Sequence, residues 1–185
     1  MTEDQPPGER RARVVSHRRV YSGRVLDLDV DEIEEPGGIR ATREVVRHSG
    51  SVVVMAVDDR DRLVLVRQYR YPVGAPLWEI PAGRQDPGES PEEGARRELE
   101  EEVAVRPARL ERLISFYVSP GFCDEVMHLF RATDLVSVPP RPEPDENIEA
   151  HWLTLAEAKA MADHGEIRDA KTLLALMLEE RRRGL

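Results

Sequence analysis

Three glutamates, Glu98, Glu101 and Glu102, lie three and four residues apart near the middle of the chain. In a helix this spacing puts their carboxylates on one face, where like charges destabilise the helix by about 0.2–0.5 kcal/mol per pair. A cation between the carboxylates would remove that cost. Carboxylate oxygens without a nearby His or Cys suit a hard ion, Mg²⁺ or Mn²⁺, which takes substrate phosphates among its other ligands. The spacing therefore indicates a metal site that handles phosphate.

The helix that must carry these acids has a clear predicted start. Ser90 is a predicted N-cap, Pro91 stands at the first helical position, and Glu93 closes a capping box. An apolar residue then recurs every four positions, at Ala95, Leu99 and Val103. This narrow stripe predicts that one side of the helix packs on the core while the acids lie beside it.

Spacing alone leaves a second interpretation open, a solvated acidic helix face on which Arg97 and Glu101 form an exposed ion pair. The whole segment favours the metal site, because it resembles the Nudix box, G-x5-E-x7-R-E-U-x-E-E-x-G-U with U apolar. Eight of its nine fixed positions match, at Gly83, Glu89, Arg97, Glu98, Leu99, Glu101, Glu102 and Val105. Ala104 stands where the family has Gly, which ends the helix in a left-handed conformation. We expect Ala104 to carry a steric cost or the helix to end differently, with a changed C-cap and an intact site.

The resemblance also implies roles for the box residues. Glu98 and Glu102 would be the central ligands of Mg²⁺, or of Mn²⁺ in its place, and Ala82 would offer its backbone carbonyl. Glu101 would be a further ligand or a catalytic support, and Arg97 would hold the carboxylates by hydrogen bonds. The implied chemistry is metal-assisted displacement at phosphorus by a bound water.

A general base must take the proton of that water. In the ADP-ribose branch of the family, the base comes from an acidic loop well after the box. Here residues 136–147 form a proline-rich acidic loop, in which Glu146 is favoured and Glu143 is second. The alternative is that these acids only keep the loop solvated.

Segments outside the box resemble the same branch. The sequence RQYRYP from Arg67 resembles the segment in which an Arg grips the diphosphate, and we favour Arg70 over Arg67. Pro120 lies fifteen residues after Val105, where this branch has a proline, although it would also fit a plain turn. The sequence GEIRDAK, residues 165–171, fits the branch as well.

The N-terminal segment resembles the module that such enzymes exchange between subunits of a homodimer. Relatives with tryptophans there use them against the adenine, but this segment has none. Arg43, Tyr21 and Phe122 are the candidate base contacts in their place.

Hydrophobic periodicity predicts an α/β fold with a mixed sheet between helices over residues 49–185, preceded by a small antiparallel β module over residues 1–48. This order of elements matches the Nudix α/β/α sandwich that the resemblance implies. The predicted strands after the first basic segment are 25–34, 39–48, 51–57, 62–70, 77–81, 110–117, 126–132 and 148–153. In the first of these, Leu26, Leu28 and Val30 alternate with aspartates and form the predicted buried face. Thr154 and Asp169 are predicted N-caps of two later helices.

Composition limits the classes of molecule that the protein is expected to bind. The chain has 185 residues, with 36 acidic against 27 basic residues and a net charge of −9, which disfavours nucleic acid and anionic membranes. No apolar run approaches a membrane span, and the single Cys123 favours a reducing compartment, so we expect a cytoplasmic protein.

The function implied is Mg²⁺-dependent hydrolysis of the diphosphate of ADP-ribose to AMP and ribose 5-phosphate, by a homodimer with exchanged N-terminal strands. The alternatives are hydrolysis of another nucleoside diphosphate sugar, a non-catalytic ADP-ribose sensor, and a generic acidic dimerisation domain. Sensors often lose box glutamates, whereas all three are present here.

Overall fold

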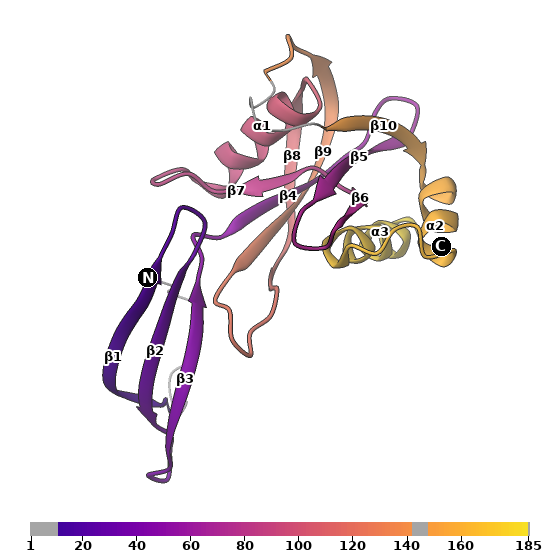
Figure 1. Cartoon of the computed structure of the whole chain (residues 1–185). Coiled ribbons are helices and arrows are strands. Elements are labelled where there is room, and N and C mark those ends of the chain that lie inside the picture. The colour runs from indigo at the N-terminus through magenta and orange to yellow at the C-terminus, as the bar shows by residue number, and fades with distance from the viewer. Residues whose placement is uncertain (1–10, 142–147, 185) are drawn as a thin grey trace. The chain divides into compact units, whose positions relative to one another are not determined.

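The computed structural model describes residues 11–141 and 148–184. The chain divides into two compact units, Met1–Ser49 with Tyr117–Glu125, and Gly50–Phe116 with Val126–Leu185 (Figure 1). The predicted domains, 1–48 and 49–185, and the dimerisation role of the first of them stay predictions.

The first unit contains an antiparallel sheet of three strands in the order β1-β2-β3. The strands are β1 (Arg13–Ser22), β2 (Asp27–Glu34) and β3 (Arg40–Arg47). Gly37 and Gly38 both have positive φ and make the turn between β2 and β3, which side chains would strain. The predicted N-terminal antiparallel strands are confirmed.

The predicted buried face of β2 is wrong. Asp29 and Asp31 are only 1% and 5% exposed, whereas Leu28 and Val30 of the same strand are half-buried. The acids are buried because polar side chains of the flanking strands cover them: the guanidinium groups of Arg19 on β1 and Arg47 on β3 bind Asp29, and the His17 ring on β1 contacts Asp31. Paired charges thus replace apolar side chains in this part of the sheet.

The second unit contains two sheets. One has the order β7-β4-β9-β8, and the other has the order β10-β5-β6. Their bounds are β4 (Ser51–Ala56), β5 (Arg62–Arg70), β6 (Ala75–Glu79), β7 (Ala82–Arg84), β8 (Val105–Tyr117), β9 (Val126–Ser137) and β10 (Glu149–Thr154). Because β4 pairs parallel with β9 and antiparallel with β7, the sheet is mixed, as predicted.

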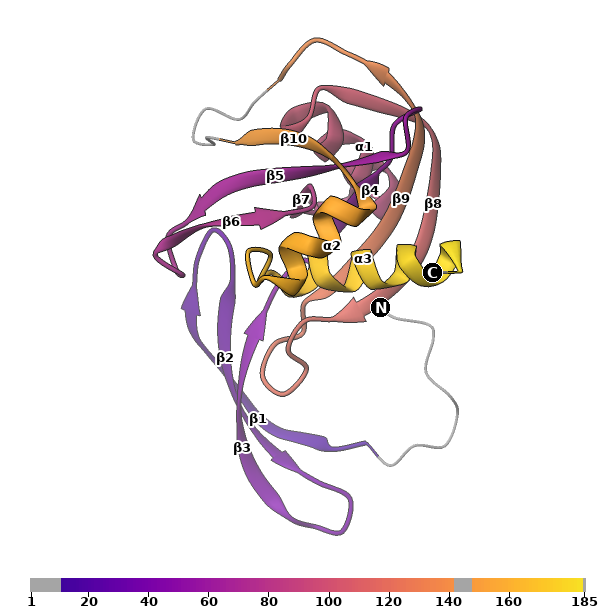
Figure 2. The ribbon, with the colours of Figure 1, turned by 90° about the vertical axis from the view of Figure 1, so that its right-hand side faces the viewer.

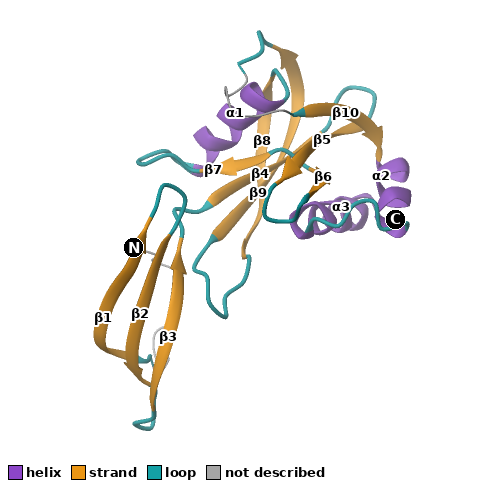
Figure 3. Ribbon diagram, in the orientation of Figure 1, coloured by secondary structure: helices purple, strands orange, loops and turns teal. Residues whose placement is uncertain are grey.

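Helices cover both faces of the β4 sheet (Figure 2). They are α1 (Pro91–Glu102), α2 (Leu155–Asp163) and α3 (Ala170–Arg183). Val52 and Val54 share a buried cluster with Leu99 of α1, whereas Val53 and Met55 share another with helices α2 and α3. Successive β4 side chains therefore alternate between two cores, which explains the continuous apolar run, and the predicted α/β/α arrangement is confirmed (Figure 3).

Several boundaries differ from the prediction. The strand β8 begins at Val105 rather than at Leu110, β9 runs on to Ser137, and the short strand β7 was not predicted. The strand β8 contains Pro107 near its start, and a proline argues against a strand in a sequence, whereas the edge position of β8 in its sheet tolerates it. No helix among residues 11–141 and 148–184 is long and apolar enough to cross a membrane.

Candidate active site

The helix α1 is fixed at its start and along one side. The hydroxyl of Ser90 accepts from the backbone N–H of Glu93, whose carboxylate in turn accepts from the backbone N–H of Ser90, so the predicted capping box is confirmed. Ala95 and Leu99 are fully buried in the core. Together the cap and the buried stripe set the rotation of the helix and hold its acidic face beside β7.

Arg97 binds the acids of the box to one another. Its Nε lies 2.9 Å from Glu89 Oε1, and its Nη1 lies 2.7 Å from Glu98 and 2.9 Å from Glu101. Its Nη2 also donates to the backbone carbonyl of Arg84, at 2.9 Å. The hydrogen bond to Glu89 raises the pKa of the Arg97 guanidinium, burial opposes this, and Glu98 and Glu101 add to the rise. One guanidinium therefore offsets the mutual repulsion of three carboxylates.

Gly83 makes room for one of these acids. The carboxylate of Glu98, a residue that is 7% exposed, lies directly over the backbone of Gly83, and a Cβ atom added there would collide with it. Next to it, the backbone N–H of Ala82 donates to Glu102 at 3.2 Å. The glycine of the box thus allows the strand before the helix to approach the acidic face closely.

The donor chemistry of this face fits a hard divalent ion. Among the residues that the structure describes, no three Asp, Glu, His or Cys side chains already gather as a ligand group. Arg97 holds Glu98 and Glu101, while Glu102 accepts from Ala82. Three carboxylates and a backbone segment kept close by Gly83 are oxygen donors, which Mg²⁺ and Mn²⁺ accept. The assignment of Ala82, Glu98, Glu101 and Glu102 as ligands stays a prediction.

Arg70 and Arg67 lie in different surroundings. Arg70 makes two parallel hydrogen bonds to Glu79, from Nε at 2.7 Å and from Nη2 at 2.8 Å. That interaction with Glu79 raises the pKa of Arg70, and the charge of Glu102 contributes, so Arg70 lies within the field of the acidic face. Arg67 instead lies over the ring of Trp78, at 5.8 Å from its centroid. The assignments of Arg70 and Arg67 to the diphosphate stay predictions.

Five further predicted site residues belong to the first unit or lie outside the described residues. Arg43, Pro120 and Phe122 belong to the first unit, where Arg43 pairs with Glu35 at 3.0 Å. Phe122 is exposed, and its backbone carbonyl accepts from Val46. Glu143 and Glu146 lie outside the described residues. All five assignments stay predictions.

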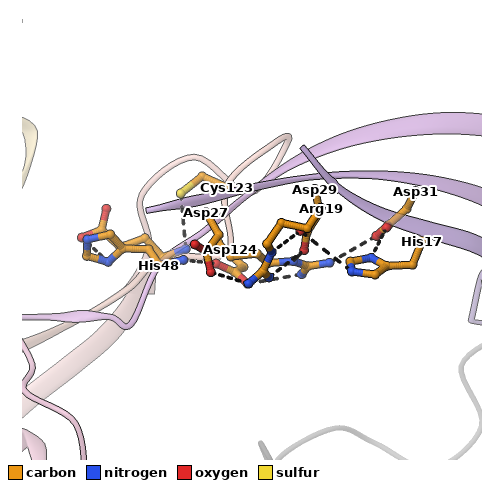
Figure 4. Close-up of polar contacts among 10 residues, drawn as sticks. His17, Arg19, Asp27, Asp29, Asp31, His48, Cys123 and Asp124 are labelled. Carbon is orange, nitrogen blue, oxygen red and sulfur yellow. Dashed lines mark hydrogen bonds and ion pairs between the residues drawn. The ribbon is translucent and has the colours of Figure 1, made fainter. Parts of the chain in front are cut away.

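Two charged clusters were not predicted. In the first unit, Asp29 accepts from Arg19 at 2.8 Å and from Arg47 at 2.9 Å, and Arg47 also reaches Asp124 (Figure 4). In the second unit, Glu79 is 2% exposed and is shared by Arg70 and Lys171. Of the residues in these two clusters, only Glu79 could have been noticed in the sequence, because it is a charged residue inside an otherwise apolar predicted strand.

Comparisons with known proteins agree with this geometry. A family model described as NUDIX domain matches residues 47–176. The chain is 39% identical to an ADP-ribose pyrophosphatase of Bacillus subtilis (strain 168), over 89% of this chain and 90% of that protein. It is 40% identical to a methanol dehydrogenase activator of Bacillus methanolicus, with the same coverage. It is 38% identical to an ADP-ribose pyrophosphatase of Mycobacterium tuberculosis (strain ATCC 25618 / H37Rv), over 83% of this chain and 75% of that protein.

The fold agrees as well. A crystal structure of an ADP compounds hydrolase superposes with a TM-score of 0.82, at 24% identity, over 97% of this chain and 98% of that one. The box, the sandwich and the match over residues 47–176 all agree, and the chain belongs to the Nudix family.

Proposed function

We propose that this chain is a Nudix pyrophosphatase that hydrolyses the diphosphate of ADP-ribose to AMP and ribose 5-phosphate. The observation that carries the proposal is the arrangement of Glu89, Glu98 and Glu101 around Arg97, beside the backbone at Gly83. It keeps negative oxygen donors together on one face, as a divalent ion requires. The choice of ADP-ribose as the substrate is supported by the two relatives named ADP-ribose pyrophosphatase, which are 38% and 39% identical to this chain.

Each residue then has a defined task. Glu98, Glu102 and the carbonyl of Ala82 would hold Mg²⁺, with Glu101 as a further ligand. A bound ion of this kind neutralises diphosphate oxygens and lowers the pKa of a coordinated water. Arg97 orients the carboxylates, and Arg70 donates to the diphosphate. Glu146, or Glu143 in second place, takes the proton from the attacking water.

We assign the nucleoside contacts and the dimer interface to the first unit. Arg43, Pro120 and Phe122 would contact the nucleoside. Apolar side chains stand exposed on and beside β1 and on the turn after β2, at Val14, Val15, Val20, Tyr21, Val25 and Ile39. So many exposed apolar side chains in one small unit support a protein interface, for which we propose a homodimer with exchanged N-terminal strands. The acidic net charge and the lone Cys123 support a cytoplasmic enzyme without nucleic-acid partners.

A second candidate substrate class has its own support. The chain is 35% identical to a GDP-mannose pyrophosphatase of Yersinia enterocolitica serotype O:8 / biotype 1B (strain NCTC 13174 / 8081), over 79% of this chain and 82% of that protein. The acidic face acts on the diphosphate and not on the leaving sugar, so the same chemistry serves either substrate. A panel of ADP-ribose, GDP-mannose and UDP-glucose at equal concentration separates the two, and the proposal expects the highest kcat/KM for ADP-ribose.

Substitution of Glu102 tests the activity itself. We expect Glu102→Gln to lower kcat on ADP-ribose by at least about 100-fold, because it removes charge from the ion-binding face. EDTA should abolish turnover by the unaltered protein, and added Mg²⁺ should restore it. The matched control is Glu100→Gln on the same helix, where Glu100 pairs with Arg106 instead. Near-normal turnover by Glu102→Gln, or indifference to EDTA, would refute the proposed function.

A further inference from the structure

A buried acid lies behind Arg70. Glu79, the last residue of β6, accepts two parallel hydrogen bonds from Arg70 and one from Lys171. Lys171 belongs to the first turn of α3, and its Nζ also lies 3.0 Å from the carboxylate of Asp169. Burying a carboxylate and an ammonium is costly, and apolar residues of similar size would stabilise the fold at least as well. The cluster therefore needs an explanation other than stability.

The two cations of this cluster differ in access. The side chain of Arg70 is 38% exposed, whereas that of Lys171 is 9% exposed. Only Arg70 offers donors to a ligand, and Lys171 is confined to Glu79 and Asp169. Two parallel hydrogen bonds fix the plane of a guanidinium, which a single acceptor does not. Glu79 thus determines the direction in which the free edge of Arg70 points.

The charge balance gives Lys171 a separate role. Two cations, Arg70 and Lys171, face two anions, Glu79 and Asp169, so the cluster is neutral. Without Lys171 the cluster would carry a net negative charge within the field that already includes Glu102. An anionic diphosphate would then meet repulsion where Arg70 should attract it.

The first turn of α3 is fastened to the same strand end. The hydroxyl of Thr172 accepts from the backbone N–H of Ile80 at 2.9 Å, and Asp169 caps α3. Lys171 therefore approaches Glu79 on a helix that two further contacts hold in place. Ile80, which one of these contacts holds, lies two residues before Ala82. The sequence segment GEIRDAK, which has no role in the chemistry proposed above, supplies both Asp169 and Lys171.

We propose that Glu79 and Lys171 are positioning residues for diphosphate binding: Glu79 orients Arg70, and Lys171 balances Glu79 so that Arg70 keeps its attraction for an anion. The inference rests on the proposed function in one respect, that Arg70 contacts the diphosphate. Neither residue touches the substrate.

The test is a set of double-mutant cycles with Arg70→Ala. We expect Glu79→Gln and Lys171→Met each to raise KM for ADP-ribose about tenfold, with a smaller change in kcat. Each single variant leaves its remaining partner paired, because Lys171 keeps Asp169 and Glu79 keeps Arg70. In the Arg70→Ala background Glu79→Gln should change KM less than about twofold, since its effect passes through Arg70, and Lys171→Met should change KM less than it does alone.

A matched lysine provides the control. Lys159 of α2 pairs with Glu180 of α3, so Lys159→Met removes a lysine–glutamate contact of α3 that involves neither Glu79 nor Arg70. It should leave KM unchanged. If Glu79→Gln and Lys171→Met raise KM as much in the Arg70→Ala background as alone, or if Lys159→Met matches Lys171→Met, the inference is wrong and the cluster is only structural.

Equilibrium binding of ADP, which carries the diphosphate of ADP-ribose without its terminal ribose, separates this inference from the proposed function. Arg70→Ala, Glu79→Gln and Lys171→Met should weaken ADP binding to similar extents. If they do so in a protein that does not cut ADP-ribose, the proposed function fails and the positioning role stands. If ADP-ribose is cut but none of the three weakens ADP binding, the positioning role fails and the proposed function stands.

Discussion

The Nη1 atom of Arg97 lies 2.9 Å from the Oε2 atom of Glu101, one helical turn further along α1. The same nitrogen also donates to Glu98 at 2.7 Å, while the Nε and Nη2 atoms hold Glu89. A planar group with five donors in a fixed fork meets all of these acceptors at once, and a lysine ammonium does not.

We therefore expect Arg97→Lys to lower kcat by about 10- to 100-fold and to raise the Mg²⁺ concentration required for half-maximal rate. The carboxylates would lose their orientation while the net charge stays the same. Steady-state rates across a Mg²⁺ titration measure both effects. The control is Arg96→Lys, because Arg96 donates to the backbone carbonyl of Pro107 and not to the acidic face. Equal Mg²⁺ requirements for Arg97→Lys and the unaltered protein would contradict this role.

The end of α1 gives a prediction about stability. Ala104 has a φ of 56°, the left-handed conformation in which a family glycine is expected, so the predicted steric cost is present and the predicted change of the C-cap is wrong. A Cβ in this conformation costs about 1–2 kcal/mol, of which the greater freedom of glycine in the unfolded chain offsets part. We expect Ala104→Gly to raise the free energy of unfolding by about 0.5–1 kcal/mol. Urea denaturation measures it.

Ala108→Gly is the control for that substitution, because Ala108 is an exposed residue of β8 without a positive φ. It should lower stability, as glycine does in ordinary extended backbone. A gain from both variants would show that the left-handed conformation of Ala104 is not the cause.

Features that depend on a few neighbouring residues could be predicted from the sequence. The capping boxes at Ser90 and Thr154, the N-cap at Asp169 and the bounds of β5 all follow from such local patterns. The same is true of the box itself, whose residues all fall between Gly83 and Val105.

Features that depend on residues far apart in the sequence could not be predicted. Lys171 and Glu79 are 92 residues apart in the sequence, and neither residue alone indicates a pair. The inverted face of β2 has a similar cause, because Asp29 is buried only when Arg19 and Arg47 from two other strands cover it. Alternation of apolar and acidic residues predicted a two-sided strand correctly, and the choice of buried side depended on charges elsewhere.

The link between α3 and the end of β6 gives another prediction about stability. Thr172 is fully buried, and its hydroxyl is the acceptor for the backbone N–H of Ile80. Thr172→Val keeps the shape and leaves that N–H without its acceptor, which costs about 1–3 kcal/mol. Chemical denaturation should detect this loss. Thr42→Val is the comparison, since Thr42 makes an exposed hydrogen bond to Glu32 and should change stability by no more than about 0.5 kcal/mol. Equal losses would argue against a special role for the buried hydroxyl.

The cluster around Asp29 makes the stability of the first unit depend on pH. The hydrogen bond from Arg19 is the main cause that lowers the pKa of Asp29 from 3.8 to about 2, and Arg47 contributes while burial opposes. A carboxyl whose pKa is lower in the folded state stabilises the fold above its unfolded pKa, and this stabilisation is lost as the pH falls through the folded pKa. Asp29→Asn should therefore be less stable than the unaltered protein at neutral pH, with the full difference present above pH 3.8 and a shrinking difference from there towards pH 2.

Hydrogen exchange of the β1, β2 and β3 amides at a series of pH values measures that difference within the unit itself. Glu44→Gln on β3 is the control: Glu44 is exposed, and it should show no comparable change between the same pH values. A difference between Asp29→Asn and the unaltered protein that stayed constant from neutral pH to pH 2 would mean that the charge of Asp29 is not what holds the three strands together.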